Sequence, residues 1–212
     1  MTSLLIAFLL VLLLPLFIAT WRTSLLGLAC QGALMGWIAW SSHPEPTPAT
    51  VVALVDLIGL RALLAPILLY RVLRGQGAPR RNDVIPPNMF SWTVAVVLVL
   101  LAFQFADQAV PRESEQQTFV AVSAAALLLG FMVLSTQSVP FSQVVGALRI
   151  ENALALFEIS GATMTHSDTQ EVFAVRLAQM VIYVVSVAMC AFYLRTLHVK
   201  SDADAAPPRP PL

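Results

Sequence analysis

Long apolar stretches dominate this chain and decide what it can fold into. Each is close to the ~20 residues that an α-helix needs to cross the hydrocarbon core of a bilayer. They cover residues 3–20, 24–41, 50–70, 89–106, 118–136, 141–160 and 172–194. Closed β-barrels also span membranes, but their strands alternate in polarity, and the run from Leu4 to Leu14 does not. The sequence therefore predicts an all-α fold, a polytopic membrane helical bundle of about seven transmembrane helices.

Composition agrees with this prediction. Of the 212 residues, 58% are hydrophobic and 11% are charged, whereas a soluble domain carries about 25% charged residues. We predict a membrane domain over residues 1–200 and a disordered cytoplasmic tail over 201–212, which is rich in proline and aspartate. No phosphate-binding loop, nucleophile motif or cluster of metal ligands is visible. The chain is therefore expected to be non-catalytic alone, without a metal or cofactor of its own and without a nucleic-acid partner.

Basic residues predict the orientation in the membrane. With seven spans, the loops after the first and third spans and the C-terminus face one side. That side collects Arg22, Arg71, Arg74, Arg80, Arg81, Arg195, Lys200 and Arg209. The opposite side holds only Arg112. The positive-inside rule then places the N-terminus outside and the C-terminus in the cytoplasm, in the cell (inner) membrane. The basic segment 71–87 is interpreted either as a contact for anionic lipid or as a docking surface.

Ionisable residues inside the predicted spans are the candidate functional residues. A charge at the bilayer centre costs about 2.5–3.5 kcal/mol, so such residues face the bundle interior or a hydrated cavity. There they pair with each other or carry protons. Arg61 and Glu151 lie near the middles of their spans. The complete set is Asp56, Arg61, Arg149, Glu151, Glu158, Glu171 and Arg176.

Helical spacing places Glu151 and Glu158 on one face. With Ala155 they recur at i, i+4 and i+7, so a small side chain separates the two carboxyl groups. Two carboxyl groups at this spacing, with room for water, suit a stepwise proton relay. Arg61 is a nearby cation able to influence whether Glu151 holds its proton. The Arg149 side chain points to a different face of the helix, because Arg149 is only two residues from Glu151.

Structural interpretations of the same residues stay open. A static buried ion pair that fixes helix packing is the alternative role for Glu151. For Arg149, Asp56 and Arg176, this structural role is favoured as much as a functional one. Glu158 and Glu171 lie near helix ends, where a charged side chain can reach the membrane surface.

Small and polar residues in the second span predict close helix packing. Gly32 and Gly36 form a small-xxx-small spacing that lets helices approach closely. Gln31 is a polar group near mid-membrane and is expected to form interhelical hydrogen bonds. Asn152 is assigned the same kind of packing role.

Three stretches of the chain resemble the hydrogenase-4 component E family. They are Val145-Gly-Ala-Leu-Arg-Ile-Glu-Asn-Ala-Leu154, Leu28-Ala-Cys-Gln31 and Arg61-Ala-Leu-Leu-Ala-Pro66-Ile-Leu-Leu. That family supplies a membrane subunit to energy-converting [NiFe] hydrogenases and formate hydrogenlyases. Its C-terminal half is similar to the K subunit of complex I and to the C subunit of multisubunit cation/proton antiporters.

The resemblance implies a function and partners. The chain would link the redox arm of a complex-I-like oxidoreductase to antiporter-like subunits and contribute to proton translocation. Its partners would be those membrane subunits and hydrogenase-like catalytic subunits, which would hold the metal centres. Glu151 and Asn152 would correspond to the membrane glutamate region of the K subunit, and Arg61 to a basic residue of the third span. Two departures are visible: Leu148 stands where the K-subunit glutamate is usual, and Glu171 is one position from the expected acidic residue.

The resemblance also implies an internal repeat. Three helices, a connecting helix and three more would form a parallel 3+1+3 arrangement, with Gln31 equivalent to Glu151 and Arg61 near Gln170 and Glu171. Two other functions remain as alternatives. One is a subunit of a multisubunit cation/proton antiporter, and the other is a purely structural membrane subunit.

Overall fold

The structure is a computed structural model that describes residues 2–17, 20–42, 47–75, 89–110, 115–136, 139–162 and 169–205. Within these ranges it is all-helical and contains no strand, which confirms the predicted fold class. The elements are α1 (Thr2–Phe17), α2 (Trp21–Ser42), α3 (Pro48–Leu54), η1 (Val55–Leu64), α4 (Ala65–Gly75), α5 (Met89–Ala109), α6 (Glu115–Thr136), α7 (Pro140–Ala162) and α8 (Thr169–Ala205). The elements α3, η1 and α4 follow without a break and form one continuous helix.

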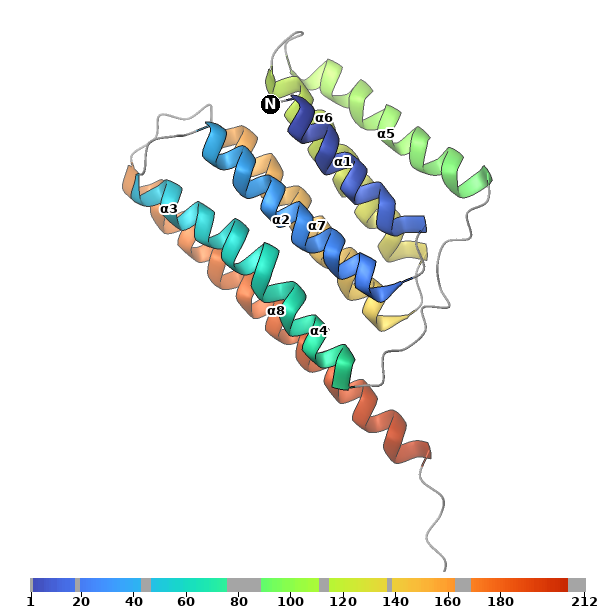
Figure 1. Cartoon of the computed structure of the whole chain (residues 1–212). Coiled ribbons are helices and arrows are strands. Elements are labelled where there is room, and N and C mark those ends of the chain that lie inside the picture. The colour runs from blue at the N-terminus through green and yellow to red at the C-terminus, as the bar shows by residue number, and fades with distance from the viewer. Residues whose placement is uncertain are drawn as a thin grey trace, which may run out of the picture.

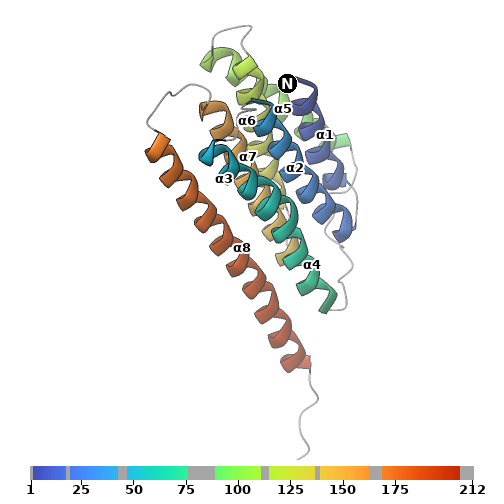
Figure 2. The ribbon, with the colours of Figure 1, turned by 60° about the vertical axis from the view of Figure 1, so that its left-hand side comes forward.

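The helices form two layers (Figures 1 and 2). In one layer α1 packs against α2, and α2 packs against the continuous α3–η1–α4 helix. In the other layer α6 packs against α7, and α7 makes a smaller contact with α8. The layers meet where α1 contacts α6, α2 contacts α7, and α3 and α4 contact α8. Helix α5 packs on α6 at one edge.

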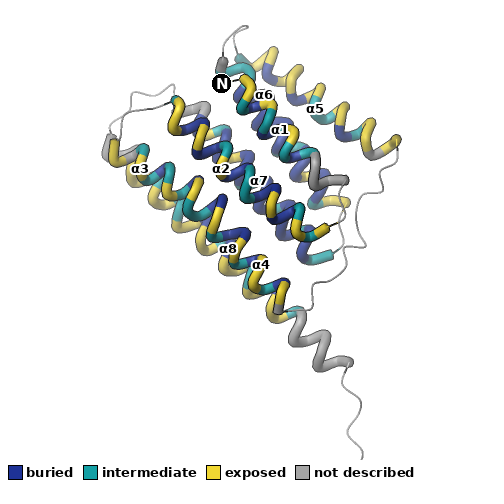
Figure 3. Tube along the Cα trace, viewed as in Figure 1, coloured by how far each residue is buried: buried dark blue, intermediate teal, exposed yellow. Residues whose placement is uncertain are grey.

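Four helices of the described part are long and apolar enough to cross a membrane. They comprise Thr50–Arg74, Trp92–Ala109, Gln116–Thr136 and Phe173–Leu197. Large apolar side chains are exposed along α5 and α8, which suits contact with lipid (Figure 3). This is therefore a membrane protein with an all-helical fold.

Helices α2 and α7 are not among those four, and both carry polar side chains inside the bundle. Ser24 and Gln31 of α2 are fully buried, as is Asn152 of α7, and Arg149 is only 1% exposed. These side chains lower the hydropathy of α2 and α7 but face protein rather than lipid. In the first helix, the apolar part within the described residues is Thr2–Leu13.

Several sequence predictions concern segments at or beyond the helix ends. Helix α8 continues through residues 201–205, the first part of the segment predicted to be disordered. Residues 206–212 lie outside the described residues, as do Arg80, Arg81 and Arg112.

Glycine residues bring α2 and η1 into close contact, as the small-xxx-small spacing predicts. A Cβ atom added at Gly32 would lie 2.5 Å from the backbone nitrogen of Ala62. One added at Gly36 would lie 2.5 Å from Cγ1 of Ile58. The two helices therefore have no room for larger side chains at these positions.

This contact gives a stability prediction. Gly32→Ala is expected to lower the free energy of unfolding by about 1–3 kcal/mol, because the backbone of Ala62 must shift. Gly59→Ala is the matched control, since its added Cβ would meet only Cγ1 of Val55 at 3.9 Å. Unfolding in detergent micelles measures both variants. Equal stability of the two variants would contradict the close contact.

Candidate functional site

Arg61 and Asp56 form a buried ion pair within η1. The Arg61 Nε donates to the Asp56 Oδ2 at 2.9 Å, and the two side chains are 7% and 16% exposed. Five residues advance an α-helix by about 500°, so the pair would point some 140° apart in regular α-helix. In a π-helix residues i and i+5 are joined by backbone hydrogen bonds and lie one above the other. The π-helical conformation therefore brings the two charges together.

The local sequence explains where this unusual segment ends. The N–H of Ala65 donates to the carbonyl of Leu60, five residues earlier. The next residue, Pro66, has no backbone N–H and cannot donate to the preceding turn. The start of the continuous helix is regular, with Pro48 at its first position and the Thr47 hydroxyl accepting from the N–H of Thr50 at 3.2 Å.

A polar network extends from Arg61 across the bundle. The Arg61 Nη1 donates to the Asn152 Oδ1 at 3.2 Å, and the Asn152 Nδ2 donates to the Gln31 Oε1 at 3.3 Å. On the other side, the Arg61 guanidinium lies 4.1 Å from the centroid of the Tyr183 ring, within the range of a cation–π interaction. Four helical segments, α2, η1, α7 and α8, thus meet at one arginine. Gln31 and Asn152 are thus hydrogen-bonded to each other between α2 and α7.

A recess of about 160 Å³ opens beside this network, between α7 and α8. Glu151, Ala155 and Glu158 all line it, so the predicted shared face is confirmed. The remaining lining residues are Arg61, Leu154, Gln179, Ile182 and Tyr183. Its volume gives room for several water molecules.

Among the described residues, neither glutamate of the recess forms an ion pair. The Glu158 Oε1 accepts from the Gln179 Nε2 at 2.7 Å, and Ser186 lies near the Glu151 carboxyl group. In the described part of the chain, Arg61 is ion-paired with Asp56 instead. A carboxylate placed at membrane depth without a paired cation is costly, and such groups mark ion and proton pathways.

Unsatisfied polar atoms surround the same place. The Gln31 Nε2, the Asp56 Oδ1 and the Tyr183 hydroxyl are buried and have no hydrogen-bond partner among the described residues. An unpaired buried polar atom costs about 1–3 kcal/mol. Tyr183 also lines the recess, so one of these atoms belongs to a residue of its wall.

The structure separates the other predicted residues from this group. Arg149 is almost fully buried but does not line the recess, which agrees with its predicted different direction. Glu171 lies in the first turn of α8, and its side chain is outside the described residues. Arg61 and the pair Gln170 and Glu171 lie at different positions along their helices. Arg61 lies in the middle part of its continuous helix, whereas those two residues begin α8.

Sequence reasoning missed three residues of α8. Gln179 is hydrogen-bonded to Glu158, the Tyr183 ring lies against Arg61, and Ser186 lies near Glu151. A signal was present, because they recur at i, i+4 and i+7, the same spacing that joins Glu151 to Glu158.

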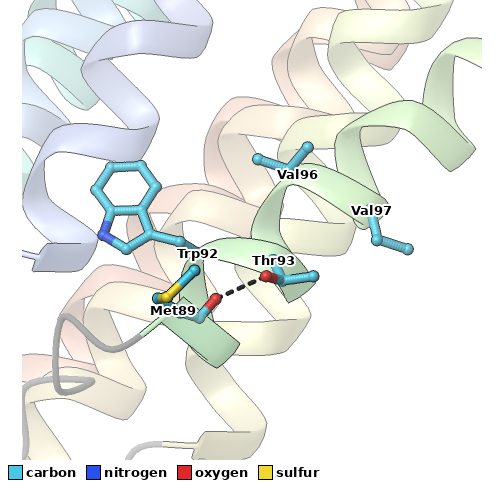
Figure 4. A pocket seen from close by; sticks show the side chains of 5 residues that line it. All are labelled: Met89, Trp92, Thr93, Val96 and Val97. Atoms are coloured by element: carbon cyan, nitrogen blue, oxygen red, sulfur yellow. Dashed lines mark hydrogen bonds between the residues drawn. The ribbon is translucent and has the colours of Figure 1, made fainter.

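A second groove, of about 420 Å³, lies along the start of α5 (Figure 4). It is lined by Met89, Trp92, Thr93, Val96 and Val97, and the Thr93 hydroxyl donates to the carbonyl of Met89 at 2.7 Å. None of its described lining residues is ionisable. The recess beside Arg61 is therefore the stronger candidate for chemistry.

No group of three or more potential metal ligands lies together in the ranges that the structure describes. Comparison of the chain with protein-family models, with curated proteins and with solved structures found no match.

Proposed function

We propose that this chain is a membrane subunit of a complex-I-like assembly, an energy-converting [NiFe] hydrogenase or formate hydrogenlyase. It links the redox arm to antiporter-like subunits and contributes to proton translocation. The observation that carries the proposal is the recess between α7 and α8. Glu151 and Glu158 line it, neither of them in an ion pair with a described residue, and Arg61 lines it from η1. The resemblance of residues 145–154, 28–31 and 61–69 to hydrogenase-4 component E supplies the type of assembly.

In this proposal protons pass between the two glutamates through water. Their side chains belong to one face of α7, with Ala155 between them. Gln179 orients the Glu158 carboxyl group through a hydrogen bond. Arginine is not a proton carrier, so the proposed role of Arg61 is electrostatic. The chain holds no metal centre or flavin itself, and the catalytic chemistry belongs to partner subunits.

We also propose seven spans with the N-terminus outside, arranged as a parallel 3+1+3 repeat. Support comes from the order of the helices. The series α1, α2, α3–η1–α4 forms one layer and the series α6, α7, α8 forms the other, and corresponding members are in contact. Gln31 and Asn152, from the corresponding helices α2 and α7, are hydrogen-bonded to each other. The positive-inside rule supports the orientation.

Co-purification tests the proposed assembly. The tagged chain, extracted in a mild detergent, is expected to bring hydrogenase-like large and small subunits together with antiporter-like membrane subunits, which mass spectrometry identifies. Recovery of antiporter subunits alone would support the cation/proton antiporter instead. Recovery of the chain without partners would contradict both proposals.

A purely structural role is the second candidate, and the Arg61–Asp56 pair favours it. Both charges are compensated within one helix, and Asn152 ties Arg61 to α7. Such a network can fix the arrangement of helices without moving protons. Retained proton pumping after substitution of both Arg61 and Glu151 would support this role.

A further inference from the structure

Arginine side chains gather at the end of the bundle where α2 begins and α4 ends. Leu25 of α2, Leu73 of α4 and Leu194 of α8 belong to one buried cluster, so these helix ends lie together. The exposed arginines of α2 and α4 at this end are Arg22, Arg71 and Arg74. In the described part of the chain, no acidic side chain forms an ion pair with them. This end therefore carries uncompensated positive charge.

An aromatic pair joins the two helices at the same place. The ring centroids of Trp21 and Tyr70 are 5.4 Å apart, with the rings tilted by 37°. The Arg22 guanidinium lies 5.3 Å from the centroid of the Trp21 ring. Arg74 follows Tyr70 by four residues and so lies on the same face of α4, one turn further along. Arg22 and Arg74 therefore flank the Trp21–Tyr70 pair.

Exposed apolar side chains continue from both arginines toward the membrane interior. Leu26 lies one turn after Arg22 and is 64% exposed. On the other helix, Ile67 lies about two turns before Arg74 and is 46% exposed. The surface thus combines positive charge, aromatic rings and apolar side chains in the order of a phospholipid's headgroup, interface and acyl chain.

The start of α2 adds a favourable field. The helix is 22 residues long, and the positive end of its dipole favours an anion near its first turn. The N–H of Thr23 already donates to the Thr20 hydroxyl at 3.3 Å. The helix dipole, and not this N–H, would therefore attract an anion.

We propose that this surface binds an acidic phospholipid. Its phosphate lies between Arg22 and Arg74 against the Trp21–Tyr70 pair, and its acyl chains run along Leu26 and Ile67. Free phosphate shares the charge of the headgroup but has nothing to place on the apolar side chains. Basic pockets between transmembrane helices are known to recognise anionic headgroups. The site is separate from the recess beside Arg61, and the proposal does not depend on the proposed proton pathway.

Lipid competition tests this proposal. The full chain is reconstituted in nanodiscs that contain equal amounts of phosphatidylglycerol and phosphatidylcholine. It is then released, and native mass spectrometry counts the lipids that it retains. The wild-type chain is expected to retain phosphatidylglycerol preferentially. The Arg22→Gln/Arg74→Gln variant is expected to lose about thirtyfold in this preference, since each arginine near an anionic surface contributes a factor of about five.

Two controls define the result. Arg195→Gln removes an exposed arginine of α8, a helix that carries neither ring of the aromatic pair, and it is expected to keep the preference. Inorganic phosphate added during release is expected not to displace the lipid. An unchanged preference in the double variant would overturn the proposal. An equal loss in Arg195→Gln, or displacement by phosphate, would do so as well, because neither result requires a lipid site at Trp21 and Tyr70.

Discussion

Replacing Glu151 by glutamine is expected to abolish proton translocation by the assembled complex. Glutamine has nearly the same shape and still presents a hydrogen-bond acceptor, but it cannot bind and release a proton. The loss should therefore appear without a loss of assembly. Proton movement into proteoliposomes, followed with a pH-sensitive dye, measures the effect, and co-purification of the partner subunits checks assembly.

A second buried polar residue provides the control for this substitution. Ser123 of α6 is fully buried and does not line the recess. Ser123→Ala removes a polar group from the bundle without touching the proposed pathway, so pumping is expected to continue. Full pumping by an assembled Glu151→Gln complex would exclude the proton-carrying role of Glu151 and favour the structural one.

Removing the charge of Arg61 is expected to destabilise the fold strongly. Arg61→Met leaves Asp56 inside the bundle without its cation, and breaking a buried pair in this way costs about 3–5 kcal/mol. The variant also loses the hydrogen bond to Asn152 and the contact with the Tyr183 ring. Equilibrium unfolding in detergent micelles measures the change in the free energy of unfolding.

The double variant Asp56→Asn/Arg61→Met separates the ion pair from the other contacts of Arg61. Because it has no uncompensated charge, it is expected to recover most of the lost stability. A double-mutant cycle gives the coupling energy of the pair. If the double variant is as unstable as Arg61→Met, the cost arises from Asn152 and Tyr183 rather than from the stranded charge of Asp56.

The regular helices of the site could be predicted from the sequence. Glu151, Ala155 and Glu158 share a face because α7 is an ordinary α-helix with the expected 3.6-residue period. The close contact at Gly32 followed from residue size alone. Gln31 was expected to bond across helices, since a polar group at that depth needs a partner, and Asn152 is that partner.

The pairing of Asp56 with Arg61 could not be predicted in the same way. A regular α-helix places them on different faces. The residue types of the segment do not predict a π-helix over ten residues. Tyr183 was missed for another reason. A tyrosine on an apolar helix has no visible role until the packing of α8 against α3 and α4 brings its ring over Arg61.

The π-helical segment also bears on how this chain tolerates changes in length. A π-helical turn contains more residues than an α-helical turn. The segment η1 therefore contains more residues than an α-helix of the same length would. If one residue is deleted there, a π-helical turn can become an α-helical turn, and α3 and α4 keep their neighbours. The same conversion would move Asp56 and Arg61 to different faces. Deletion of one residue in this span, without any substitution, is therefore enough to break the buried ion pair.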